Sequence, residues 1–424
     1  MTVIDPDTTG RDTVDILDPD LLRDPVSGYS RIREQAPSAW ANVPGLGPMH
    51  LATRYADVRL VLNDPRFVMA APQRAAGGPD PMELQLQARG VPPECMPYLR
   101  AGLTDTDGAD HARLRTLVSR AFTVRRVAAL RPRVVEITER LLDRLVETAR
   151  AADDGVVDLL ADFAYPLPII VICELVGIPE ADRYRWRRWS EVLVTGSGPE
   201  FGEALREMIA WTRELIEQRR AAPADDLISG LIHAQAVDGD RLDDVEMVSL
   251  ILTLVIAGHE TTAHLIGNGT AALLTHPEQY ALLRRDPEIT SRAVHELLRW
   301  CGPALAARMR YASEDLEVGG VVVRRGEAVM PMLVGANHDP RMFPEADRLD
   351  ITRTPESGRR ETHLAFAHGL HYCLGAALAR QEGEVAFAAL ARRFPGLALA
   401  VEPTRLERPM APGSLRLTAL PVTL

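Results

Sequence analysis

The sequence of 424 residues contains only four cysteines, and no two of them have CxxC spacing. This excludes a disulfide scaffold, a zinc ribbon and a cysteine run for an iron–sulfur cluster. Aromatic residues make up only 5% of the chain, and 48 lysine and arginine residues are outnumbered by 59 aspartate and glutamate residues. The resulting formal net charge of −11 argues against a nucleic-acid-binding protein, because such proteins carry a basic face.

Long apolar runs are also missing. The N-terminus, MTVIDPDTTGRDTVDILDPDLL, is acidic and has no apolar core, so it does not match a secretory signal. The most apolar stretch, about residues 247–258, is shorter than the roughly 20 residues that cross a bilayer. We therefore expect a cytoplasmic protein without a membrane anchor. No repeat or linker divides the chain, which predicts one domain over residues 1–424 with residues 1–20 as a loosely ordered arm.

Helical periodicity dominates the chain. Apolar residues recur with helical spacing over residues 125–152, 201–220, 243–275, 291–300 and 375–393. Strand patterns are few and short, and they cover residues 49–53, 316–325, 328–333 and 416–420, the second of these turning at Gly319 and Gly320. Residues 336–361 are polar and proline-rich without periodicity, which is typical of a stretch held by a functional site. The pattern predicts a mainly α fold with minor β.

One cysteine lies where a glycine-rich segment meets a predicted helix, in FAHGLHYCLG (366–375). The free N–H groups and the dipole at the start of that helix are expected to lower the pKa of Cys373 and favour the thiolate, which is the metal-ligating form. Gly369 and Gly375 would let the backbone approach a flat ligand closely. Two alternatives stay open at this point: a small buried hydrophobic cysteine, or a zinc site made of His368, His371 and Cys373.

Polar residues interrupt the longest predicted helix at AGHETT (257–262). A threonine hydroxyl in a helix can bond the carbonyl one turn back and make room for water. Glu260 and Thr261 supply an acid and an alcohol for proton transfer. The alternative is that the helix emerges into solvent here, but the sequence AHLI that follows is apolar again, which argues against it.

Two further pairs are weaker signals. Glu296 and Arg299 have i, i+3 spacing, which is usually a surface contact worth a few tenths of a kcal/mol. His111 and Arg115 lie one helical turn apart in HARLR, so two cationic donors on one face could hold a carboxylate. A solvated basic face is the commoner arrangement for such a pair.

Taken in order, HARLR (111–115), AGHETT (257–262), ELLR (296–299) and FAHGLHYCLG (366–375) resemble the motifs of the cytochrome P450 family. The resemblance extends over nearly the whole chain, from residue 54 to residue 400. It implies a single large P450-like domain with small β regions and a long central helix over haem. Ala367 stands where the family often has glycine, which is a mild departure.

The resemblance also implies a role for each matching residue. Cys373 would be the axial thiolate ligand of the haem iron, and Glu260 and Thr261 would deliver protons to the oxygen that the iron binds. Glu296 and Arg299 would form a buried structural pair that Arg348 completes, which would lock residues 336–361 behind the cysteine loop. The haem-binding positions would be His111, Arg115, Ala257, Arg310, Phe366, Gly369, His371, Cys373 and Gly375. Among these, the propionates would be neutralised by His111, Arg115, Arg310 and His371.

The resemblance predicts a haem-thiolate monooxygenase that inserts one oxygen atom from O2 into an apolar small molecule. Its cofactor would be haem b, and its electrons would come from NAD(P)H through a separate ferredoxin and ferredoxin reductase. We expect a monomeric hydroxylase or epoxidase that tailors a secondary metabolite. The alternatives are oxidative coupling or dehydrogenation on the same fold, and a ligand-sensing or zinc-dependent protein.

These expectations imply a surface that binds the electron donor and a set of segments that contact the substrate. A basic docking patch for the electron donor is expected at Arg113, Arg359 and Arg360. Substrate choice is expected to rest on residues 69–103, 186–211, 303–308 and 410–414.

Overall fold

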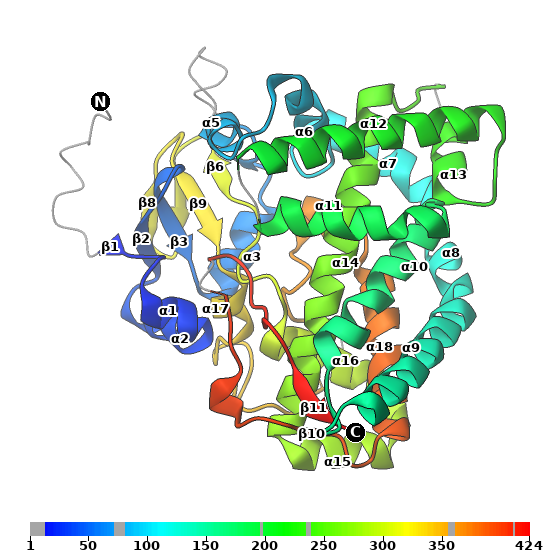
Figure 1. Cartoon of the computed structure of the whole chain (residues 1–424). Coiled ribbons are helices and arrows are strands. Elements are labelled where there is room, and N and C mark those ends of the chain that lie inside the picture. Colours follow the sequence, from blue (N-terminus) through cyan, green and yellow to red (C-terminus); the bar gives the residue numbers. More distant parts are fainter. Residues whose placement is uncertain (1–12, 72–80, 196–197, 235–238, 355–360, 410–411) are drawn as a thin grey trace.

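The computed structural model describes residues 13–71, 81–195, 198–234, 239–354, 361–409 and 412–424. A large helical region occupies one side of the molecule, and a smaller region rich in strands lies on the other side together with α1, α2 and α17 (Figure 1). The mainly α fold with minor β that the sequence predicts is confirmed.

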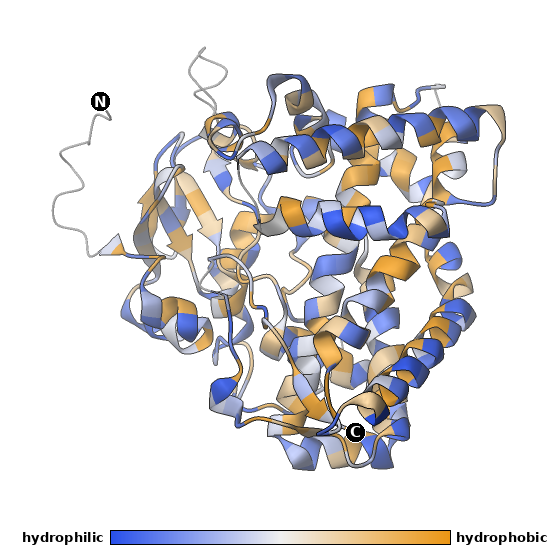
Figure 2. Ribbon diagram, in the orientation of Figure 1, coloured by the Kyte–Doolittle hydropathy of each residue, from blue (hydrophilic) through white to orange (hydrophobic). Residues whose placement is uncertain are grey.

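The helices alternate hydrophilic and hydrophobic residues along α9, α11 and α12, as amphipathic helices around a core do (Figure 2). The helices are α1 (Pro19–Arg23), α2 (Pro25–Gln35), α3 (Tyr55–Asn63), α5 (Pro81–Ala88), α6 (Met96–Arg100), α7 (Gly108–Ala121), α8 (Val124–Ala129), α9 (Arg131–Ala151), α10 (Pro166–Val176), α11 (Arg183–Thr195), α12 (Pro199–Ala221), α13 (Leu227–His233), α14 (Asp244–Thr275), α15 (Pro277–Arg285), α16 (Thr290–Cys301), α17 (Leu333–Asn337) and α18 (Ala376–Arg393).

The strands form one six-stranded sheet, one three-stranded sheet and one hairpin among the described residues. The large sheet has the order β1-β2-β3-β9-β6-β4, the small sheet has the order β10-β11-β5, and β7 pairs with β8. Their bounds are β1 (Thr13–Val14), β2 (Ser38–Val43), β3 (Gly47–Ala52), β4 (Phe67–Val68), β5 (Val156–Asp158), β6 (Arg310–Ala312), β7 (Leu316–Val318), β8 (Val321–Val323), β9 (Ala328–Pro331), β10 (Ala398–Leu399) and β11 (Pro421–Thr423).

Two predicted boundaries are wrong. The single helix expected over residues 125–152 is divided at Leu130 into α8 and α9, because Pro132 lies in the first turn of α9. A proline lacks the N–H that a continuous helix needs and clashes with the carbonyl four residues back. The last strand was expected over residues 416–420, but β11 begins at Pro421 and pairs with β5 and β10 instead.

The centre of the helical region is α14, which packs against α10, α12, α16 and α18. The Asp243 side chain accepts from the Glu246 N–H and the Glu246 side chain accepts from the Asp243 N–H, so a full capping box begins the helix. Among the described residues α14 is the one helix long and apolar enough to cross a bilayer, and 67% of its most apolar window is buried inside the protein. A mostly buried core helix passes that test as readily as a membrane span, so this one helix is only weak evidence of membrane insertion.

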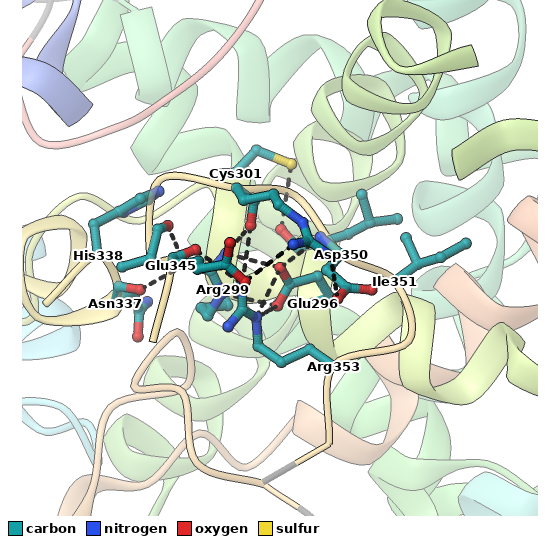
Figure 3. Close-up of polar contacts among 12 residues, drawn as sticks. Glu296, Arg299, Cys301, Asn337, His338, Glu345, Asp350, Ile351 and Arg353 are labelled. Carbon is teal, nitrogen blue, oxygen red and sulfur yellow. Dashed lines mark hydrogen bonds and ion pairs between the residues drawn. The ribbon is translucent and has the colours of Figure 1, made fainter. Parts of the chain in front are cut away.

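A buried ion pair joins α16 to the irregular segment after α17. Arg299 donates Nε–H to Glu296 Oε2 at 2.8 Å and Nη2–H to Glu296 Oε1 at 2.7 Å, and both side chains are 2% exposed (Figure 3). The remaining Arg299 donors bond the carbonyls of Asn337, Ala346 and Arg348 at 2.9–3.2 Å. The guanidinium thus fixes the path of a segment that has no regular structure of its own.

Arg353, not Arg348, completes this pair. The Arg353 Nε lies 3.2 Å from the Glu296 carboxylate, and its Nη groups donate to the carbonyls of Pro344, Glu345 and Arg348. The Arg348 side chain is 56% exposed and pairs with Glu345 and Asp350 at the surface. The expectation for Arg348 is therefore wrong, because only its backbone carbonyl faces the buried cluster.

Two non-glycine residues of the described chain have a left-handed backbone: Glu345, with φ of 50°, and Ala367, with φ of 59°. An L-residue in this region loses about 1–2 kcal/mol to the contact between Cβ and the carbonyl oxygen. Ala367 N–H bonds the Leu364 carbonyl at 2.8 Å, so the strained residue closes the turn that leads into the cysteine loop. This strain explains physically why glycine suits the position.

Replacing Arg353 by alanine should lower the free energy of unfolding by about 1–3 kcal/mol, because it leaves buried charge and carbonyls without donors. Arg348→Ala should change it by less than about 0.5 kcal/mol, since exposed pairs contribute little. Urea unfolding midpoints of the two variants check this. Equal effects would mean that Arg353 is not the third member of the cluster.

Ala367→Gly should stabilise the protein by about 0.5–1 kcal/mol, because relief of left-handed strain exceeds the added entropy of the unfolded chain. Ala365→Gly is the control: Ala365 has no positive φ, so glycine there should only destabilise. The comparison is again made by unfolding midpoints. A loss of stability in both variants would contradict the strain assigned to Ala367.

Candidate functional site

Cys373 lies between a 3-10 turn at Gly369–His371 and the first residue of α18. Its N–H donates to the Phe366 carbonyl at 3.0 Å, which closes the loop. Its side chain is exposed, whereas the other three cysteines are buried. The one open thiol of the chain therefore lies at the start of a helix, as the sequence predicts.

The pKa of Cys373 is raised, not lowered. Cys373 keeps surface that a water molecule can reach, yet it lies among many protein atoms, and this burial is the largest cause of the raised pKa. The backbone N–H groups of Gly375 and Ala376 and the Arg115 cation lower the pKa. The helix start and the Arg115 cation thus lower the pKa of Cys373, as the sequence predicts. Loss of water around the thiol raises the pKa by more than these groups lower it. The expected net direction was wrong, because sequence does not report the depth of a site.

Helix α3 packs against the cysteine loop. Gly369 has φ of 70°, and a Cβ at this position would lie 2.6 Å from the Leu62 carbonyl oxygen, so only glycine fits this close approach. Arg59 Nε–H donates to His368 Nε2 at 3.3 Å. Phe366 is 8% exposed and packs against the rings of His363 and Tyr372. These contacts fix the conformation of the loop that carries the Cys373 thiol.

Four basic side chains that the sequence singled out are brought near this loop by different elements. His111 and Arg115 come from α7, Arg310 comes from β6, and His371 comes from the 3-10 turn. The rings of His111 and His371 have centroids 4.3 Å apart, and Arg115 is close enough to Cys373 and His111 to influence the pKa of both. The structure gathers these residues into one basic cluster.

The basic cluster has little negative charge close to it. Burial lowers the pKa of His111 to about 4, helped by the charges of His371 and Arg115, and burial lowers the pKa of Arg310 to about 10. His111 Nδ1 is buried without a hydrogen-bond partner. Asp107 is the carboxylate beside the cluster, and its Oδ1 lies 3.4 Å from His371 Nε2. Sequence reasoning missed Asp107, whose only signal is its place in the turn before α7.

This donor set fits a haem group. An orphaned buried imidazole nitrogen and partly desolvated guanidinium groups favour anionic partners, and haem carries two propionates. The exposed thiol would supply the other group that haem needs, an axial ligand of the thiolate type. A Cβ at Gly375 would lie 3.9 Å from Cys373 Sγ, an ordinary van der Waals distance, so protein atoms give no steric reason for glycine at this position.

The middle of α14 carries a second part of the site. Between Met247 and Leu273 of this helix only Ala257 and Thr261 are exposed, and they lie one turn apart on the same face. Thr261 Oγ1 donates to the Ala257 carbonyl at 2.7 Å, as expected for a threonine in such a gap. The helix does not emerge into solvent, because Thr262 is 3% exposed and His264 is 2% exposed.

Glu260 faces a different set of groups from those near Thr261. Its Oε1 lies 3.1 Å from His264 Nε2, 3.5 Å from the Tyr165 hydroxyl and 3.7 Å from Arg416 Nη1. Burial raises the pKa of Glu260, but the His264 hydrogen bond and the charges of His264, His259 and Arg416 outweigh it, so the net pKa is lowered. Sequence reasoning missed these partners, although the i, i+4 spacing of Glu260 and His264 was a visible signal.

The zinc-site alternative is not favoured. His368 bonds Arg59, His371 faces Asp107, and Cys373 lies beside Arg115, so their ligand atoms have separate partners. Within the described part of the chain, the one group of metal-ligating side chains that converges is His295, Glu361 and His363.

Each member of that group already has a hydrogen-bond partner. His295 Nδ1 lies 3.1 Å from His363 Nε2, and the Glu361 carboxylate accepts from the Tyr372 hydroxyl at 3.0 Å and from Arg380 at 2.5 Å. The Ala365 N–H bonds His363 Nδ1, which leaves the proton of that ring on Nε2. These contacts support the base of the cysteine loop.

The expected docking patch is only partly described. Arg113 is paired with Asp240 at 3.2 Å and with Glu246, so its cation is engaged at the start of α14 rather than offered to a partner. Arg359 and Arg360 lie outside the described residues. The expected substrate segments are interrupted in the same way at residues 72–80, 196–197 and 410–411.

Comparison with known proteins gives a consistent result. The family model for cytochrome P450 matches residues 172–410. The chain is 41% identical to the vitamin D(3) 25-hydroxylase of Pseudonocardia autotrophica over 403 residues, which covers 93% of this chain and 92% of that protein. It is 39% identical to the mycinamicin IV hydroxylase/epoxidase of Micromonospora griseorubida over 89% of this chain and 90% of that protein.

A solved structure agrees in fold over nearly the whole chain. The cytochrome P450 PksS of the bacillaene polyketide synthase of Bacillus subtilis 168 superposes with a TM-score of 0.85 at 35% identity, covering 96% of this chain and 99% of that chain. The chain therefore belongs to the cytochrome P450 family, as a haem-dependent monooxygenase that takes oxygen from O2 and electrons from separate redox partners.

Proposed function

We propose that the loop around Cys373 binds haem b with the Cys373 sulfur as the axial ligand. The observation that carries this is an exposed thiol at the start of α18 next to a buried basic cluster with an unpaired imidazole nitrogen. His111, Arg115, Arg310 and His371 would hold the propionates. Backbone contact with the flat face of the group would come from Ala257, Phe366, Gly369 and Gly375. Haem with a thiolate ligand supplies the cleavage of the O–O bond.

The chain's own part in the reaction is placement and proton transfer. The Thr261 hydroxyl, bonded to the Ala257 carbonyl, is positioned to order water in the open face of α14. Glu260 is the acid that replenishes the proton at that water. Glu296 and Arg299, with Arg353, hold the segment that leads into the cysteine loop.

The proposed substrate is an apolar small molecule of secondary metabolism, oxidised as a hydroxylation or epoxidation. Support comes from relatives named for mycinamicin IV and for polyketide biosynthesis. The segments proposed to contact it are residues 69–103, 186–211, 303–308 and 410–414. Within the third segment, Arg308 is paired with Asp105 at 2.6 Å. The half-buried apolar residues of that segment are Pro303, Ala304, Ala306 and Ala307.

The electron donors are proposed to be a ferredoxin and its NAD(P)H-dependent reductase. The chain is proposed to work as a monomeric, single-domain protein of residues 1–424 in the cytoplasm. A ligand screen by haem spin-state shift would supply a substrate. Turnover of that substrate under 18O2 then tests the proposed function: one labelled oxygen atom in the product supports it, and an unlabelled coupled or dehydrogenated product would overturn it.

Replacing Arg115 or His111 by alanine should weaken haem retention, since each removes a charge-assisted bond to a propionate worth about 1.5–3 kcal/mol. Arg113→Ala is the matched control on the same helix, because its side chain faces Asp240 and Glu246. The rate of haem transfer to an excess of apomyoglobin measures retention. Equal haem loss in all three variants would show that the face assigned to α7 is wrong.

Thr261→Ala should leave substrate binding and NAD(P)H consumption nearly normal while product falls and hydrogen peroxide rises. The reason is that the hydroxyl orders the water for the second proton, and placement of this kind is worth about 10²–10⁴ in rate. Thr262→Ala should do much less, because Thr262 is buried and rotated about 100° around the helix. Product and peroxide are measured per NAD(P)H consumed. Uncoupling by Thr262→Ala alone would move the assigned register by one residue.

A further inference from the structure

A cavity of about 210 Å³ lies between α9, α10 and the start of α11, three helices that are neighbours in the fold (Figure 1). Helix α9 contributes Ile137, Arg140, Leu141 and Arg144, and their spacing of i, i+3, i+4 and i+7 places all four on one face of the helix. None of the residues that line this cavity belongs to the basic cluster around Cys373 or to α14. The cavity is therefore separate from the candidate haem site.

The lining of this cavity combines apolar and charged side chains. Its apolar members are Ile137, Leu141 and Ile170, of which the first two are buried. Its charged members are three arginines and one glutamate, namely Arg140, Arg144, Arg183 and Glu180. Three positive charges thus face one negative charge, although the whole chain has a formal net charge of −11. A lining of this composition favours an anion that also carries an apolar group.

The acidic residues of α9 that flank Arg140 pair with other cations. Their partners are Arg133 for Glu136, and Arg392 and Arg393 of α18 for Glu139 and Asp143. In the described part of the chain, neither Arg140 nor Arg144 forms an ion pair or a side-chain hydrogen bond. Both of these side chains are exposed, so their charges can meet a ligand that enters the cavity.

Arg183 is the least exposed cation of the cavity. Its side chain is 18% exposed, and its Nη1 lies 3.1 Å from Glu174 Oε1. Glu174 also accepts from Arg133 Nε–H at 2.8 Å and from Arg133 Nη2–H at 2.7 Å, so two guanidinium groups share one negative charge. Arg183 Nε is buried without a hydrogen-bond partner among the residues that the structure describes. The Arg183 guanidinium is therefore fixed in position and still has an unused donor.

We propose that this cavity binds a small organic phosphate, in which a phosphate monoester is attached to a compact apolar group. A phosphate monoester carries a charge of about −1.5 to −2 at neutral pH, which matches the excess of two positive charges in the lining. Guanidinium groups bond phosphate oxygens in pairs, and the isoleucine and leucine side chains would contact the apolar group. The volume of about 210 Å³ is below the roughly 300–1,000 Å³ of sites for drug-sized ligands, so the ligand is compact.

The first experiment measures binding of phenyl phosphate to the holoenzyme by isothermal titration calorimetry, with inorganic phosphate as the comparison. Phenyl phosphate should bind as one molecule per chain and more tightly than inorganic phosphate, because it alone has an apolar group for the cavity. Its affinity should fall as the salt concentration rises, since two of the arginines are exposed. Absence of saturable binding would overturn the inference. Equal affinity for the two phosphates would also overturn it, because attraction to surface charge would then be sufficient.

The second experiment repeats this titration on variants of the charged lining. Arg140→Gln and Arg144→Gln should each weaken binding of phenyl phosphate by about two- to fivefold, as expected for contacts with exposed charges. Glu180→Gln should strengthen binding by a similar factor, because the Glu180 carboxylate repels the phosphate. All three side chains are exposed, so the free energy of unfolding and the haem content should stay close to those of the wild-type protein.

Arg150→Gln is the matched control for these variants. Arg150 is an exposed arginine in the last turn of the same helix, and it does not line the cavity. Its replacement changes the net charge of the protein by the same amount and should leave the affinity unchanged. An equal loss of affinity in Arg150→Gln would contradict the inference, because net charge would then set the affinity. Weaker or unchanged binding in Glu180→Gln would contradict it as well.

The third experiment tests the apolar part of the cavity and its separation from the haem site. Ile170→Ala should weaken binding of phenyl phosphate and leave that of inorganic phosphate unchanged, and an equal change for both would overturn the proposed apolar contact. The Soret band is recorded during each titration with phenyl phosphate. It should not move, because the cavity shares no residue with the candidate haem site. A Soret shift with the same midpoint as the calorimetric curve would place the ligand at the haem and overturn the inference.

Discussion

The bidentate ion pair between Glu296 and Arg299 is the constraint on which the thiolate side of the molecule depends. Both side chains are 2% exposed. Removing two charges from water costs several kcal/mol per ion, and the attraction between the two ions offsets this cost only when further hydrogen bonds satisfy them. The compensation comes from Arg353 and from carbonyls of residues 337–348. The bonds that make the buried charge tolerable therefore also fix an irregular segment. That segment reaches the cysteine loop through the bond from the Leu364 N–H to Asn337 Oδ1.

The distribution of charge is the second organising feature. The chain carries a formal net charge of −11, yet His111, Arg115, Arg310 and His371 meet at the interior with Asp107 as their nearby carboxylate. Cations that are partly removed from water and short of partners favour an anionic group bound among them. Glu260 of α14 has the reverse surroundings, because this one carboxylate has an arginine, two histidines and a tyrosine around it.

Much of the fold and the site was predictable from sequence, and the failures have physical causes. Helical spacing predicted the Thr261 bond to the carbonyl one turn back, and the loop-to-helix pattern predicted Cys373 at the start of a helix. For Glu296 and Arg299, spacing indicated only a surface contact, and the resemblance to cytochrome P450s predicted that the pair is buried. Arg348 and Arg353 are close in the sequence and equally basic, so only the path of the irregular segment distinguishes them. The contacts of Glu260 with Tyr165 and Arg416 join residues far apart in the chain, and sequence spacing gives no signal for them. The pKa of Cys373 depends on depth, which periodicity does not measure.

The central claim is that Cys373 supplies a thiolate to the haem iron, and the spectrum of the reduced protein with CO tests it most directly. The wild-type protein should show the long-wavelength Soret band that thiolate ligation gives. Cys373→Ala should lose that band even if haem stays in the pocket, while Cys95→Ala, which removes a buried cysteine elsewhere, should keep it. A thiolate-type spectrum that survives in Cys373→Ala would contradict the account.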